Sequence, residues 1–221
     1  MFKICSMPES MPWKIVERAL LSEPATIGHF RLMGFPDCAI RPMHPVPRIA
    51  GPAVTLALPA ADSSLLHHAV GKLRPGDVVV IDRLGDRHHA CLGGGVAYAL
   101  ARAGVAGVII DGPIADPGEL RDVGLAVWAR GVASITTRLQ GIGGLMNVPV
   151  SCGGAVVNPG DLVIADEGGV VFIPRDEAAV DIERAIQLQE MEKRGLPLIN
   201  DNKTLGELTG ASAMVMTRLN Q

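Results

Sequence analysis

A run of three glycines is the first feature of this sequence that could bind a ligand. Gly93-Gly94-Gly95 opens a predicted helix over 94–102. Consecutive glycines let backbone N–H groups approach a ligand, and the partial positive charge of a helix N-terminus favours a carboxylate or a phosphate. The run has neither the GxGxxG pattern of dinucleotide-binding folds nor the GK[ST] of phosphate-binding loops. It is therefore either a carboxylate-binding turn or a tight loop that only needs glycine.

Asp116 is the second feature, at the end of the loop 111–116 that follows a predicted buried strand over 108–111. Ligands of open α/β sheets bind outside the carboxyl ends of the strands. An exposed carboxylate there suits Mg²⁺, which binds through one or two carboxylates and several waters. The alternative is that Asp116 caps the helix beginning near Pro117. The sequence leaves both interpretations open.

Two histidine pairs are weaker candidates. Adjacent residues on a helix do not share a face, so His67 and His68 do not form one metal site. His88 and His89 lie in a loop near Gly93, where they could donate protons, bind a soft metal, or simply face solvent. The sequence has no GxSxG nucleophile motif, and Cys91 alone does not indicate a thiol nucleophile.

The elements that must position these residues alternate along the chain. Buried strands are predicted over 78–81, 108–111 and 126–129, with helices over 94–102 and from about 117 between them. This order predicts a parallel sheet with right-handed crossovers. The other predicted elements are a helix over 13–21, a strand over 54–58, a helix capped by Asp62 or Ser63, a hairpin over 162–173, a helix over 175–194, and an arm after Gly195.

Composition limits the class of protein. A length of 221 residues fits one domain, and 48% hydrophobic against 3% aromatic residues predicts a core of Val, Ile, Leu and Ala. The net charge of −3 comes without a basic stripe, which argues against nucleic-acid binding. Four widely spaced cysteines without CxxC predict reduced thiols and a cytoplasmic protein. The sequence shows no signal-peptide pattern and no apolar run long enough to cross a membrane.

An ordered set of motifs resembles the RraA-like proteins, strongly over about residues 50–175. The motifs are Gly51–Thr55, Gly76-Asp77 before a strand, Gly93 before a helix, Ala103–Gly112 with an aspartate four positions on, Gly153-Gly154, Val157 with Pro159-Gly160-Asp161, and Ala165–Pro174.

The resemblance implies a single compact α/β/β swivelling-type domain over 1–221, with a largely parallel sheet and flanking helices, assembled as homotrimers and in some members as hexamers. Its enzymes are metal-dependent aldolases that release pyruvate from 4-hydroxy-4-methyl-2-oxoglutarate and decarboxylate oxaloacetate. Other members inhibit a ribonuclease. By position, Gly93, Gly94, Gly95 and Val96 would bind the substrate carboxylate, and Asp116 would hold Mg²⁺ or Mn²⁺.

Two positions depart from the aldolase pattern. The acidic residue after the first glycine is Gly94 here, and the arginine before the aspartate is Ala115. An arginine there would stabilise the enolate, and losing one such donor typically costs about 10²–10³ in rate. The residues that could compensate are Arg87, His88, His89, Arg121, and Glu190 or Glu192 from the C-terminal helix of a neighbouring subunit. The predicted catalytic residues are Asp116, His89, Glu190 and Glu192.

Three functions follow as hypotheses. The first is a metal-dependent lyase on a small 2-oxo acid, with a substrate altered by Gly94 and Ala115. The second is a catalytically degenerate regulator that binds a ribonuclease or another protein. The third is an enzyme of another class, such as an isomerase or a sugar-acid hydrolase, which would bind metal without releasing pyruvate.

Overall fold

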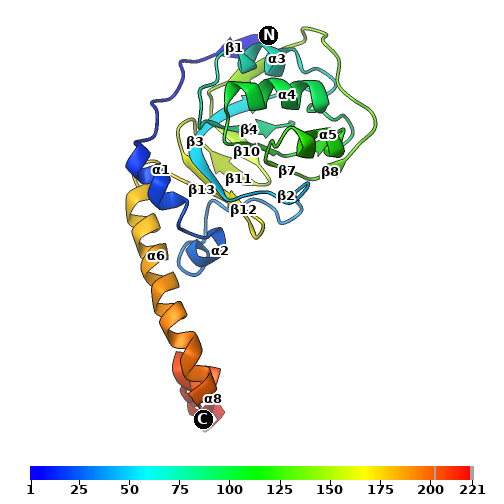
Figure 1. Ribbon diagram of the computed structural model, residues 1–221. Helices are drawn as coiled ribbons and strands as arrows, with labels where there is room; N and C mark the ends of the chain where they lie inside the picture. The colour runs from blue at the N-terminus through cyan, green and yellow to red at the C-terminus, as the bar shows by residue number, and fades with distance from the viewer. Residues whose placement is uncertain (202, 220–221) are drawn as a thin grey trace.

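A four-stranded parallel sheet forms the centre of the computed structural model, which describes residues 1–201 and 203–219 (Figure 1). Its strands are β3 (Ile49–Ala57), β4 (Val78–Asp82), β5 (Gly107–Ile110) and β7 (Val127–Ala129), paired in that order. Nearly every residue of these strands is buried, which is why they are continuous Val, Ile and Ala runs. Shorter strands extend the sheet at its edges: β1 (Phe2–Ile4), β2 (Arg41–Pro42) and β9 (Gly144–Met146).

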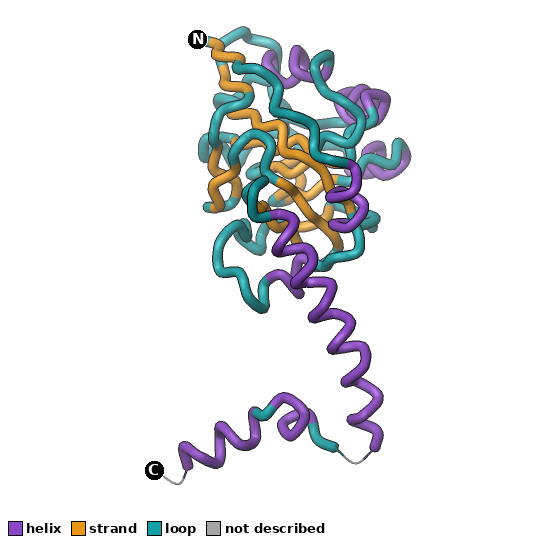
Figure 2. The backbone as a smooth tube through the Cα atoms, turned by 90° about the vertical axis from the view of Figure 1, so that its left-hand side faces the viewer, coloured by secondary structure: helices purple, strands orange, loops and turns teal. Residues whose placement is uncertain are grey.

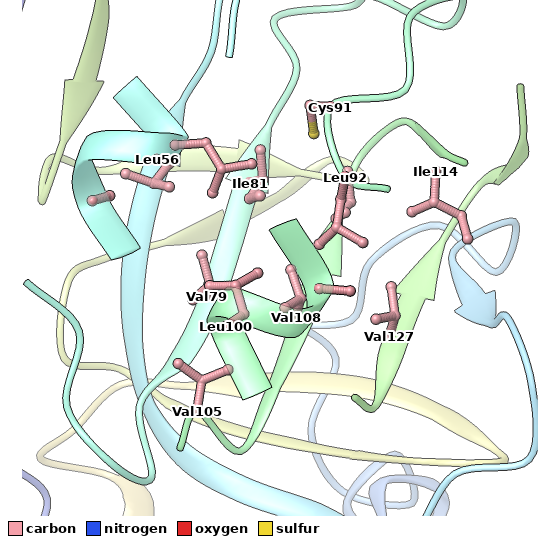
Figure 3. Close-up of a cluster of buried hydrophobic side chains, with 14 of the residues drawn as sticks. Leu56, Val79, Ile81, Cys91, Leu92, Leu100, Val105, Val108, Ile114 and Val127 are labelled. Atoms are coloured by element: carbon pink, nitrogen blue, oxygen red, sulfur yellow. The ribbon is translucent and has the colours of Figure 1, made fainter. Parts of the chain in front are cut away.

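Three helices cover one face of this sheet: α3 (Ser64–Val70), α4 (Gly94–Ala103) and α5 (Pro117–Asp122). Figure 3 shows the core beneath them, where Leu100 of α4 packs among side chains of the strands such as Val79 and Val108. The crossovers place the start of each helix beyond the carboxyl end of the preceding strand. The glycine run and Asp116 are thereby carried to one edge of the sheet.

A second β layer covers the other face. It contains the antiparallel hairpin β12 (Leu162–Asp166) and β13 (Gly169–Ile173), with β12 also paired to β3, and the hairpin β10 (Val150–Cys152) and β11 (Ala155–Val157). Side chains alternate along β12: Val163 packs against the central sheet, while Ile164 packs against helices. Those helices are α1 (Trp13–Ala19), α2 (Pro24–Ile27) and α6 (Ala178–Gly195). This layering confirms the expected α/β/β arrangement.

The chain after α6 forms an arm, as the sequence predicts. It contains the 3-10 turn Leu196–Asp201, α7 (Leu205–Thr209) and α8 (Ala211–Leu219), which extend away from the sheets (Figure 2). Neither α7 nor α8 buries a residue. Across the described residues, the structure has no helix long and apolar enough to cross a membrane.

The structure corrects some predictions of detail. The sequence placed Val96, Ala99, Leu100 and Ala103 on the inner face of α4. Leu100 is buried, and Val96 and Ala103 pack against the core partly buried, but the buried Gly94 and Ala97 were not predicted. Their small size allows α4 to lie close to its neighbours, and apolarity alone does not reveal this. Strand β3 begins at Ile49, five residues before its predicted start. Strands β1, β9, β10 and β11, each three residues long, were not predicted.

Candidate functional site

The glycine run and Asp116 lie against each other. Ala115 N donates a hydrogen bond to Leu92 O at 2.8 Å, which fixes the end of the Asp116 loop beside the start of α4. Gly94 N then donates to Asp116 Oδ2 at 3.1 Å. The same loop is held by a short parallel pair, β6 (Pro113–Ile114) with β8 (Gly131–Val132). Two segments separated by 22 residues therefore form one site.

Asp116 adopts a backbone conformation that few residues tolerate. Its φ of 53° and ψ of 48° are left-handed, a region in which aspartate is enriched among non-glycine residues. Asp116 occupies the N-cap position of α5, yet its side chain makes no capping hydrogen bond there. The interpretation of Asp116 as an ordinary helix cap is therefore wrong for its side chain. Its exposed carboxylate is directed to the N-terminus of α4 instead.

Two carboxylates occupy the space beside Gly93 and Gly94 in which a side chain would begin. A Cβ on Gly93 would lie 2.7 Å from Asp116 Oδ2. A Cβ on Gly94 would overlap Glu119 Oε2 and lie 2.6 Å from Glu119 Cδ. Glu119 is an exposed residue of α5 that the sequence reasoning missed. Its carboxylate takes up the space in which a side chain at position 94 would begin.

The start of α4 offers backbone donors to an anion. The first N–H groups of a helix have no partner within the helix. Asp116 already uses Gly94 N, so Gly95 N and Val96 N are the donors that remain. Gly95 is exposed and has no atom within 4 Å of an added Cβ. A carboxylate approaching from solvent can therefore reach these two groups.

Positive charge near this edge comes from an enclosed arginine. Ala115 is buried and contributes only a methyl group. Arg83, directly after β4, is wholly buried, and its Nη2 donates to Ala60 O and Asp86 Oδ2. Its Nε and Nη1 have no hydrogen-bond partner. The sequence reasoning assigned Arg83 no role, although an arginine directly after a buried strand is a detectable signal.

The other predicted residues have partners of their own. His89 Nδ1 lies 2.9 Å from Asp86 Oδ2, and Arg87 Nη1 donates to Asp111 Oδ1 at 2.7 Å. Arg121 binds its neighbour Asp122. Within the described residues, no hydrogen bond or salt bridge joins any of these side chains to Asp116.

Three further side chains are not brought to Asp116 within one chain. Glu190 and Glu192 are exposed on α6, which starts beside α1, far from α4 and α5, and projects away from the sheets (Figure 1). Cys91 is buried in the core, and burial raises the pKa of its thiol to about 11. A protonated, enclosed thiol does not act as a nucleophile.

The carboxylates of Asp116 and Glu119 are compatible with a hard divalent cation. The described part of the chain contains no group of three or more His, Cys, Asp or Glu residues arranged around a common metal position. A cation held here would take most of its ligands from water and substrate. Mg²⁺ is commonly bound in this way, through one or two carboxylates.

Comparison with known proteins agrees with the fold. The model of the RraA-like family (Aldolase/RraA) matches residues 25–172. A relative from Halalkalibacterium halodurans, named "Putative 4-hydroxy-4-methyl-2-oxoglutarate aldolase", is 32% identical over 163 residues, covering 74% of this chain and 77% of the relative.

Two similar solved structures have names of another kind. Streptomyces coelicolor RraAS2, described as an unusual member of the RNase ES inhibitor RraA protein family, has a TM-score of 0.74 and 26% identity, covering 83% of this chain and 96% of that one. The RNA-processing inhibitor RraA from Thermus thermophilis has a TM-score of 0.58 and 29% identity, covering 62% and 83%.

Proposed function

This chain belongs to the RraA-like family, and on that premise we propose that it is a divalent-metal-dependent lyase that releases pyruvate from a small 2-oxo acid. The observation that carries the proposal is the exposed Asp116 carboxylate, held in a left-handed conformation against the N-terminus of α4. The names of the curated relatives support an aldolase at the general level.

Each part of the site has a role in this proposal. Gly95 N and Val96 N bind the carboxylate of the substrate, aided by the partial positive charge of the α4 N-terminus. Asp116, with waters, holds Mg²⁺ or Mn²⁺. The bound ion supplies Lewis-acid stabilisation of the negative charge that develops on the keto oxygen. Substrate orientation thus comes from α4, and the metal position comes from the loop before α5.

Ala115 sets the expected limit on rate and substrate. A buried methyl group cannot bind the keto oxygen as the arginine of the aldolase pattern would. Arg83 keeps a positive charge at the same edge, but it is enclosed and does not reach solvent. We therefore propose that this enzyme is slower than an aldolase with that arginine, or that its substrate carries its negative charge at another position.

Pyruvate release tests the proposal. The release is coupled to NADH oxidation by lactate dehydrogenase, with 4-hydroxy-4-methyl-2-oxoglutarate or oxaloacetate, with Mg²⁺ or Mn²⁺, and with a chelator. Asp116→Ala should lower the metal-dependent rate by about 10²-fold or more. Asp122→Ala is the matched control, because Asp122 is an exposed carboxylate of the same helix that is paired with Arg121.

The controls decide between the lyase and the other functions. Oxaloacetate decarboxylates spontaneously with metal ions, so only a difference between wild type and Asp116→Ala counts. Equal rates would end the lyase proposal. Metal binding through Asp116 without pyruvate release would then favour another reaction class. A protein without metal binding would favour the regulator, which the names of the RraA relatives and the loss of the arginine at Ala115 support.

We also propose that the chain assembles as a homotrimer or hexamer. The arm exposes apolar side chains on α8, namely Met214, Val215, Met216 and Leu219, which a neighbouring subunit would cover. Assembly is also what would bring Glu190 or Glu192 of a neighbouring subunit near the site. The molar mass in solution, measured by light scattering, tests the assembly.

A further inference from the structure

We propose that Glu119 is the proton acceptor of this site and performs from α5 the role of a side chain that Gly94 cannot supply. The inference rests on the proposed lyase function. It is carried by the overlap between the Glu119 carboxylate and the Cβ position of residue 94. Position 94 is the second residue of the glycine run, so a carboxylate placed there lies at the opening of the anion-binding turn.

The geometry pairs Glu119 with Asp116. Asp116 Oδ2 lies next to the Cβ position of Gly93, and Glu119 Oε2 lies at that of Gly94. Two carboxylates from one loop-and-helix segment thus occupy the side-chain space of two consecutive glycines. Both residues are exposed, so a ligand at the turn would contact them from solvent.

Neither of the two carboxylates has a cationic partner in the part of the chain that the structure describes. Within residues 1–201 and 203–219, no salt bridge reaches Asp116 or Glu119, whereas Asp122 of the same helix is paired with Arg121 at 3.0 Å. Two like charges close together repel each other unless a cation or a proton lies between or beside them. The arrangement would therefore favour a cation bound beside Asp116, and it leaves the Glu119 carboxylate open to a ligand at the turn.

Cleavage of a hydroxylated 2-oxo acid requires such an acceptor. The hydroxyl proton passes to the Glu119 carboxylate, the hydroxyl oxygen becomes a carbonyl oxygen, and the adjacent carbon–carbon bond breaks. Its electron pair remains on the carbon beside the keto group and forms the enolate of pyruvate. Protonated Glu119 then returns the proton to that carbon, so the step needs no further reactant.

Other nearby groups suit this role less well. Asp116 accepts the Gly94 N–H and is the proposed metal ligand. His89 forms a hydrogen bond with Asp86, which restricts the rotation of the imidazole ring. Glu119 remains as the candidate. Its carboxylate lies at the glycine run, and its oxygens make no hydrogen bond among the described residues.

The first test compares Glu119→Gln with Asp122→Asn, a matched loss of one charge on the same helix. Glu119→Gln should lower kcat for 4-hydroxy-4-methyl-2-oxoglutarate by about 10²-fold or more, the range usual for general acid–base groups. Mn²⁺ binding, measured by calorimetry on the full-length protein, should persist and weaken by less than about tenfold, because only one neighbouring charge is lost. Asp122→Asn should keep both the rate and the affinity. Loss of Mn²⁺ binding in Glu119→Gln would overturn the proposal by making Glu119 a metal ligand.

The second test moves the carboxylate between the two chain positions. Glu119→Ala should be as slow as Glu119→Gln, and the double variant Glu119→Ala with Gly94→Glu should regain at least about tenfold in kcat, because it returns a carboxylate to the opening of the glycine run. Circular dichroism checks that each variant is folded. A double variant as slow as Glu119→Ala would overturn the proposal that Glu119 takes the role of an acidic side chain at position 94.

The variants also separate this inference from the function on which it rests. Full activity in Glu119→Gln together with an inactive Asp116→Ala would overturn the role of Glu119 and leave the lyase intact. Rates in wild type, Glu119→Gln and Asp116→Ala that all equal the metal-only background would overturn the lyase, and the role of Glu119 with it.

Discussion

Asp111 and Asp116 lie five residues apart at the same edge of the sheet, yet their surroundings differ. Asp111 binds Arg87, Arg130 and the N–H of Gly153, and its side chain is 12% exposed. Asp116 is exposed, and among the described residues its side chain has one hydrogen bond, accepted from the N–H of Gly94. An aspartate at the end of a strand is therefore not functional by its position alone. Charge compensation within the protein separates the structural carboxylate from the candidate ligand.

The largest effect on stability is expected from Asp111→Asn. It leaves the partly buried guanidinium of Arg130 with one of its two carboxylate partners, Asp37. We expect the free energy of unfolding to fall by about 3 kcal/mol. Urea denaturation measures it, with Asp116→Asn as the control expected to change by less than about 1 kcal/mol. Equal losses in the two variants would break the comparison.

Asp62 sharpens the comparison, because backbone groups rather than arginines compensate its charge. Asp62 is 1% exposed and accepts hydrogen bonds from Ser64 N, Ser64 Oγ, Gln140 N and Ile142 N. Burial alone would raise the pKa of Asp62, but these bonds together hold it well below its ordinary value. A lowered pKa means that the ionised form stabilises the fold.

The expected pH dependence follows from that sign. The contribution of Asp62 is fully present above the unfolded-state pKa of about 3.9 and is lost as pH falls toward the folded-state value. Asp62→Asn should cost about 2 kcal/mol at pH 7, and the difference from wild type should shrink as pH falls below about 4. Denaturation curves from pH 7 to pH 3 measure it. A difference that grows in acid would contradict the assigned sign.

The smallest effect on stability is expected from Gly94→Ala. The added methyl group displaces the Glu119 carboxylate, which is the end of a flexible and exposed side chain. Alanine also favours a helix over glycine by about 1 kcal/mol, so the free energy of unfolding should change by less than about 1 kcal/mol. Pyruvate release should nevertheless fall, because Glu119 moves. A stable variant with an unchanged rate would count against any role for Glu119.

The sequence predicted the parts of the site that depend on neighbouring residues, and it missed the parts that depend on contacts between distant segments. The glycine run at the start of α4 and the loop ending at Asp116 were found because turn residues and apolar runs mark the ends of strands and helices. Glu119 was missed although it lies three residues after Asp116, because nothing local shows that its side chain reaches Gly94. The same holds for Arg83, whose burial depends on Ala60 and Gly112 from neighbouring strand ends.

The sequence alone determined the alternating strands and helices, the resemblance to the RraA-like proteins, and the chemical types available near the glycine run, because these depend on residues that are close along the chain. The tertiary structure decided which carboxylates remain without a cation. That outcome depends on Arg87 and Arg130 meeting Asp111, and on α5 packing beside α4 so that Glu119 meets Gly94. Contacts of this kind join segments about 20 or more residues apart, and the packing of the layers rather than local propensity sets them.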